Sequence, residues 1–205
     1  MREFFNKNGS FIWRLMLNQI GLTIFGLMTS MTAAAVGDMF RDESGAASRT
    51  YMLWTSVFAI VFYMFIDYAA IKEEGQKDKI RVDAGRAAAE PWRGFKIGLA
   101  ASLPNLVLAV IIVVCSILGR EGGLAIEWAG ALSGTAKLIA LVLQAMYWGV
   151  LISLPGVTTV STIPAFSYLL IPLPALICSS LAYLAGFRDI SLIRRIKSFF
   201  TPEGE

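Results

Sequence analysis

The stretch IGLAASLPNLVLAVIIVVCSIL, residues 97–118, contains no charged side chain and decides the class of this protein. A helix of about 18 or more apolar residues is long enough to cross the ~30 Å hydrocarbon core of a bilayer. Residues 15–36 and 138–187 are likewise free of Asp, Glu, Lys and Arg. These recurring runs predict an integral membrane protein whose chain crosses the bilayer several times.

Composition supports the same conclusion. The chain has 205 residues, of which 56% are hydrophobic and 16% are charged, whereas soluble domains average about 25% charged residues. The net charge is +3, and the basic residues flank the apolar runs. That placement is typical of the positive-inside tendency of membrane proteins, so we expect the lipid bilayer as a partner and no nucleic acid.

The pattern predicts an all-α polytopic transmembrane bundle forming a single domain over residues 1–205. About six membrane segments are expected, the last two of them short and either proline-broken or re-entrant. Their predicted bounds are residues 11–36, 51–71, 95–118, 131–154, 157–171 and 174–187. A competing interpretation of the last two is one proline-kinked span, with the tail then on the outside. The first run also loosely fits a cleavable signal peptide, but its length favours an uncleaved span.

Charge predicts the orientation. The loop at residues 72–94 is the most charged segment, and the tail at residues 188–205 is basic. Both are expected in the cytoplasm, which places the N-terminus there as well and requires an even number of crossings. In the tail, an amphipathic interfacial helix is predicted to carry Arg194, Arg195 and Lys197 against anionic lipid. Short loops favour a bacterial cytoplasmic membrane.

Enzymatic chemistry is not expected. The chain has no histidine, which removes the commonest acid–base group near neutral pH and the commonest transition-metal ligand. No phosphate-binding loop, nucleophile elbow or metalloprotease motif occurs. The two cysteines lie inside apolar runs and form no CxxC pair. We therefore predict no catalytic residue, no metal and no cofactor.

Polar side chains at membrane depth are the functional candidates, because they are costly there. Lys137 is the sharpest case: it either snorkels or pairs structurally, or it faces a solute. Asn18, Asn105 and Gln144 are predicted to join it in an intramembrane polar site. Amides at this depth also form interhelical hydrogen bonds, which is the alternative role for these three.

Two further features predict packing. Arg14 and Asp67 lie at similar depths in antiparallel spans and are expected to form a structural ion pair, since one buried charge alone costs far more than a pair. Gly94-xxx-Gly98 and Gly130-xxx-Gly134 match the small-xxx-small pattern that permits close helix approach.

Two functions remain open from the sequence. Short spans, interrupted helices and polar groups near the midplane favour a transport-associated or solute-binding membrane subunit, working with another membrane or transporter subunit or as a homo-oligomer. The alternative is a non-transporting scaffold, regulator or assembly protein that docks partners through residues 72–96 and the basic tail. A polar cavity lined by Asn18, Asn105, Lys137 and Gln144 would favour the first function, and a dry, filled bundle the second.

Overall fold

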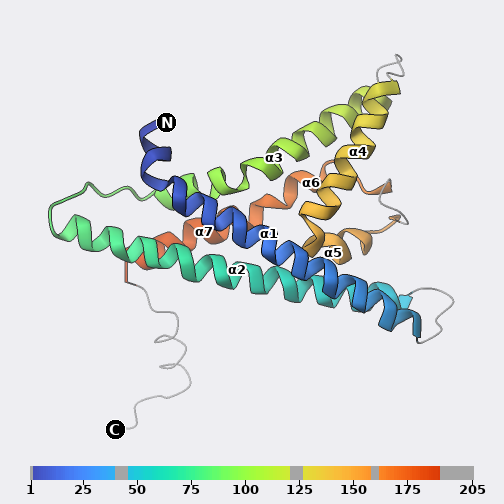
Figure 1. The fold of residues 1–205 in the computed structure, drawn as a ribbon, viewed down its shortest axis with the longest axis horizontal. Coiled ribbons are helices and arrows are strands. Elements are labelled where there is room, and N and C mark those ends of the chain that lie inside the picture. Colours follow the sequence, from blue (N-terminus) through green and yellow to red (C-terminus); the bar gives the residue numbers. More distant parts are fainter. Residues whose placement is uncertain (1, 40–45, 121–126, 158–161, 190–205) are drawn as a thin grey trace, which may run out of the picture.

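A computed structural model describes residues 2–39, 46–120, 127–157 and 162–189, and this part of the chain consists of helices joined by turns and loops, with no strand (Figure 1). The elements in chain order are α1 (Arg2–Met39), α2 (Ala46–Asp83), α3 (Arg93–Arg120), α4 (Glu127–Leu143), the 3₁₀ helix η1 (Ala145–Tyr147), α5 (Trp148–Ile152), α6 (Ser167–Leu170) and α7 (Pro172–Phe187). The predicted C-terminal amphipathic helix lies outside the described residues.

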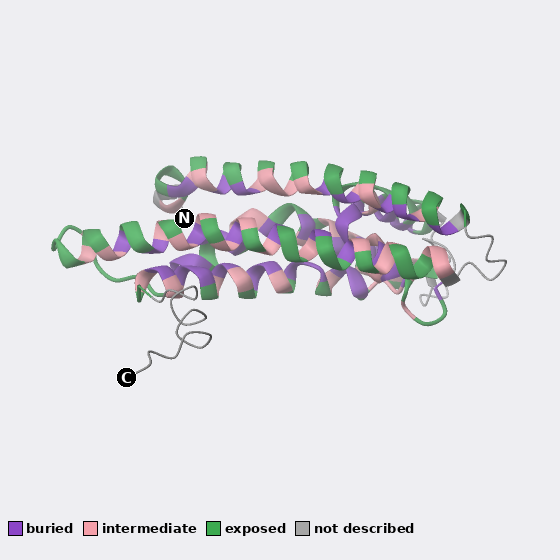
Figure 2. Ribbon diagram, turned by 90° about the horizontal axis from the view of Figure 1, so that it is seen from below, coloured by how far each residue is buried: buried purple, intermediate pink, exposed green. Residues whose placement is uncertain are grey.

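The described helices confirm an all-α membrane bundle. Four are long and apolar enough to span a bilayer: α1, α2, α3, and α6 with α7 taken together. The bent pair of α4 and η1–α5 makes a fifth if it counts as one span. Exposed residues run along the outward faces of the helices (Figure 2). Large apolar side chains such as Met28, Phe65 and Ile177 are each 60% exposed or more. So much exposed apolar surface suits contact with lipid rather than water.

Helix α2 extends well beyond the predicted end of the second span. It continues to Asp83, so much of the charged segment predicted as a loop over residues 72–94 is helical. Lys77 pairs with Glu73 at 2.9 Å and with Glu74 at 3.0 Å on one face of the helix, spacings that stabilise helices. Gly75 lies directly against the backbone of α7 at Tyr183, which anchors this extension to the bundle.

The segment predicted as a single span over residues 131–154 is broken. α4 ends at Leu143, and the following η1–α5 pair is bent from it by 88°. Neighbouring helices satisfy the interrupted backbone: the Thr23 hydroxyl of α1 donates to the Leu143 carbonyl at 2.9 Å, and the Gly149 N–H donates to the Ser56 hydroxyl of α2 at 2.8 Å. Non-helical backbone at membrane depth is tolerated where protein groups bond it in this way.

The prolines near the chain end do not form the predicted turn. The expected hairpin of residues 157–171 and 174–187 would turn at residues 172–174. Instead, α6 leads into α7, and Ser167–Phe187 is a single candidate span. Pro172 occupies the first helical position of α7. An N–H at this position would have no partner within the helix, so its absence costs no hydrogen bond, and the fixed φ of proline suits the helix. The described part of this region therefore matches the competing interpretation of one proline-containing span.

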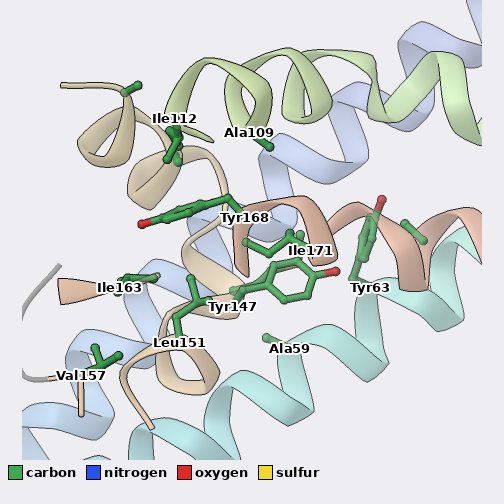
Figure 3. Close-up of a cluster of buried hydrophobic side chains, with 14 residues drawn as sticks. Ala59, Tyr63, Ala109, Ile112, Tyr147, Leu151, Val157, Ile163, Tyr168 and Ile171 are labelled. Atoms are coloured by element: carbon green, nitrogen blue, oxygen red, sulfur yellow. The ribbon is translucent and has the colours of Figure 1, made fainter. Parts of the chain in front are cut away.

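The main core lies where α2, α3, α4, η1 and α7 converge (Figure 3). Tyr63, Tyr147 and Tyr168 supply its largest side chains, and small residues such as Ala109 and Ala140 let the helices approach. A second core cluster around Ile71, Ile97 and Tyr183 lies where α7 packs on the charged end of α2 and the start of α3. The bundle is therefore tied at both its centre and its charged end.

Candidate functional site

A polar cavity of about 280 Å³ lies between the second half of α3, the first half of α4 and the segment before α6. Its lining residues are Cys115, Ser116 and Gly119 from α3, Gly130, Ser133 and Lys137 from α4, and Thr162, Ile163, Pro164 and Ala165. The α4 residues are spaced three and four apart, which places them on one face of that helix. Ser133 and Lys137 therefore enter the cavity from the same side of α4.

Lys137 is the cation of this cavity. Its side chain is 9% exposed, and its ammonium donates a hydrogen bond to the Ile163 carbonyl at 3.1 Å. A lysine ammonium has three protons to donate and no lone pair, so it is oriented by acceptors around it. The sequence left snorkelling open; the structure instead keeps the ammonium inside the protein, at a cavity that Ser133 and Thr162 also line.

The other three predicted members of the polar site lie elsewhere. Asn18, Asn105 and Gln144 are not among the described lining residues. Gln144 is 2% exposed at the α4 break, and neither of its amide atoms has a hydrogen-bond partner in the described part of the chain. It lies two turns beyond Lys137, where the chain leaves the helix axis. Asn105 is buried in α3 at 6% exposure.

The predicted ion pair of Arg14 and Asp67 is not formed. The Arg14 side chain is exposed, Asp67 is 4% exposed, and no salt bridge joins them among the described residues. Asp67 is instead buried within the bundle, where one of its carboxylate oxygens has no hydrogen-bond partner among the described residues. Similar depth in neighbouring spans did not suffice, because the two side chains leave their helices on different faces. The predicted lipid contacts Arg194, Arg195 and Lys197 lie outside the described residues.

A buried polar network that the sequence did not predict closes the charged end of the bundle. The Arg93 guanidinium donates to the Asp78 carboxylate and, at 2.6 Å, to the Asn8 side-chain oxygen. The Tyr183 hydroxyl donates to the same carboxylate at 2.9 Å. Arg93 and Asp78 are each 6% exposed. One ion pair therefore joins α1, α2, α3 and α7.

A weak sequence signal for this network existed in the neighbouring glycines. Gly94 and Gly98 of α3 lie against Tyr183 and Ser179 of α7, so a Cβ on either would overlap those residues. The small-xxx-small interpretation of this pair is therefore supported, and the close approach brings Tyr183 to the carboxylate beside Arg93. Gly134, by contrast, has open space where a Cβ would project.

Comparison with protein-family models, with curated proteins and with solved structures finds no match.

Proposed function

We propose that the protein is a solute-binding, transport-associated membrane subunit, and that the cavity around Lys137 holds the solute. The observation that carries this proposal is a buried ammonium on the wall of a polar cavity of about 280 Å³. That volume lies near the lower end of the ~300–1,000 Å³ range of small-molecule sites. The solute is therefore a small one.

The lining chemistry favours a solute that carries negative charge. Lys137 provides positive charge, while the hydroxyls of Ser116, Ser133 and Thr162 can donate or accept hydrogen bonds around it. Charge-assisted hydrogen bonds from an ammonium to a carboxylate or phosphate are shorter and stronger than neutral ones. The low dielectric of a membrane protein interior strengthens such an interaction further.

The surrounding helices have features that transport proteins use. The cavity adjoins α4, whose span is interrupted at Gln144 with an 88° bend. In transporters, discontinuous helices commonly surround the binding site, because their irregular backbone lines a cavity. Gln144 is buried at the bend, and its amide has no hydrogen-bond partner among the described residues, so it supplies polar groups that a rearrangement of this helix would engage.

The position of the cavity suggests its side of access. It lies beside Gly119 and Gly130, at the opposite end of α3 from Arg93 and the charged segment. We place that charged segment and both termini in the cytoplasm by the positive-inside rule. The cavity then faces the outer side of a cytoplasmic membrane.

The test is to purify the wild-type protein and Lys137→Met in mild detergent, and to identify bound small molecules and proteins by mass spectrometry. Lys96→Met is the matched control, since Lys96 is exposed and lies outside the cavity. We expect a small anion in the wild type and the control that is lost from Lys137→Met. Equal small-molecule content in all three proteins would reject the cavity as the site.

The scaffold function makes the opposite prediction. It expects a stoichiometric protein partner without a small solute, and binding that depends on residues 72–96 rather than on Lys137. Recovery of such a partner with equal yield from wild type and Lys137→Met would favour this second function.

A further inference from the structure

A second hollow lies on the outward surface of the bundle, in the groove between α2 and α7. Its volume is about 750 Å³, and its walls include Met64 of α2 with Ile177 and Leu181 of α7. The groove is bounded along α7 by Pro174 at one end and Arg188 at the other. This separation corresponds to ~21 Å of helix, which exceeds the ~15 Å hydrocarbon depth of one leaflet.

The Arg188 end of this groove is cationic. Arg188 caps the C-terminus of α7 and is exposed. Lys72 of α2 lies beside it in space, because the Lys72 backbone is in direct contact with Gly186. Neither side chain forms a salt bridge within the described residues. An apolar groove thus ends at two positive charges near the charged end of the bundle.

Tyr68 connects the apolar and cationic parts. It lines the groove, and the Lys72 ammonium stands 5.8 Å from the centre of its ring. Its hydroxyl is buried and has no hydrogen-bond partner in the described part of the chain. Buried hydroxyls are nearly always hydrogen-bonded in proteins, so this hydroxyl indicates an acceptor supplied from outside the described residues.

We propose that this groove binds one anionic phospholipid of the surrounding bilayer. An acyl chain lies against Met64, Ile177 and Leu181, and the phosphate lies between Lys72 and Arg188. The Tyr68 hydroxyl donates to an oxygen of the glycerol ester or the phosphate. Basic pockets beside membrane helices commonly recognise anionic headgroups, and the apolar groove adds contact area that a free phosphate ion would not use. The site is separate from the Lys137 cavity.

The test compares lipid binding by native mass spectrometry, using phosphatidylglycerol and phosphatidylcholine as probes. The test variant, called the groove pair, carries both Lys72→Gln and Arg188→Gln. Its matched control is Lys79→Gln with Arg86→Gln, which removes two cations near the same end that neither line the groove, as Arg188 does, nor stand over the Tyr68 ring, as Lys72 does. Each cation near an anionic lipid contributes about fivefold in affinity, so removing both should weaken phosphatidylglycerol binding roughly thirtyfold.

We expect the wild type and the control pair to prefer phosphatidylglycerol, and the groove pair to lose that preference. Equal loss in both pairs would show diffuse attraction by net charge and would overturn the proposal, as would equal binding of the two lipids by the wild type. Ala185→Phe fills the groove while keeping both cations. It should lower phosphatidylglycerol binding with the charge unchanged, and unaltered binding by this variant would also reject the groove.

Discussion

At the scale of single residues, ionisable side chains divide by the partners that the fold gives them. Arg93 and Asp78 are buried as a pair, and Asn8 and Tyr183 supply further hydrogen bonds. A buried pair recovers the cost of desolvation only where such additional bonds satisfy the remaining donors and acceptors. The Lys137 ammonium donates to the Ile163 carbonyl and lines a polar cavity. This environment leaves space for a solute.

Removing the acid of the buried pair should strongly destabilise the protein. We expect Asp78→Ala to lower the free energy of unfolding by about 3–5 kcal/mol, because it leaves the Arg93 guanidinium buried without its counter-charge. Denaturant titration in mild detergent measures the change. The control is Arg81→Ala, which removes the half-exposed partner of the same carboxylate and should cost no more than about 1 kcal/mol. Similar losses in the two variants would contradict the buried network.

The absence of contact between Arg14 and Asp67 gives a second prediction. Because no salt bridge joins them, the effects of Arg14→Gln and Asp67→Asn on unfolding free energy should be additive to within about 0.5 kcal/mol. A double-mutant cycle measures the coupling. A coupling of more than about 1 kcal/mol would restore the ion pair that the sequence suggested.

At the scale of elements, the break in α4 depends on contacts with two other helices. Thr23 of α1 caps the last carbonyl of α4, and Met146 of η1 packs on Gly26 of α1. Gly149 of α5 lies against the backbone of Met52 on α2. The bend is therefore built by tertiary contacts at its C-terminal side.

A methyl group at Gly149 should dislodge α5 from α2. A Cβ there would overlap the Met52 carbonyl and the Ser56 hydroxyl, and overpacking of this kind costs about 1–3 kcal/mol. We therefore expect Gly149→Ala to lower the thermal unfolding midpoint. Gly134→Ala in α4 is the matched control, since open space surrounds that position. It should leave the midpoint unchanged or raise it through the better helix propensity of alanine; a fall in both variants alike would contradict the assigned packing.

At the scale of the whole molecule, contacts at the charged end of the bundle bring four helix ends together. Asn8, Asp78, Arg93 and Tyr183 are in contact, so the start of α1, the end of α2, the start of α3 and the end of α7 share one end of the bundle (Figure 1). An even number of crossings results if the bent α4–α5 pair enters and leaves by the same face. The sequence instead predicted the even number from two short crossings within residues 157–187.

Accessibility labelling tests this arrangement. In a Cys115→Ser, Cys178→Ser background, single cysteines at Lys7 and Arg86 should react with an impermeant thiol reagent from the same side of the membrane. A cysteine at Trp128, which is 60% exposed at the start of α4, should react from the other side. Labelling of all three positions from one side, or of Lys7 and Arg86 from different sides, would refute the arrangement.

Much of the fold could be predicted from local sequence. The expected third span, residues 95–118, differs from α3 by two residues at each end, because an uninterrupted apolar run must bond its own backbone in lipid. The same runs indicated a helical membrane protein without catalytic motifs. Lys137 was also found, since a charge inside an apolar run stands out without any knowledge of its neighbours.

Tertiary structure decided what the runs could not. From the sequence, Asp78 and Arg93 belong to a charged loop that is expected to be solvated. Only the approach of α7 through Gly94 and Gly98 buries them. Gln144 lies in a continuous apolar stretch, and contacts with α1 and α2 determine that the helix stops there. The sequence by itself determined which segments enter the membrane, because burial in lipid depends on composition. Contacts between polar side chains depend on the rotation and crossing of the helices, and only packing sets these.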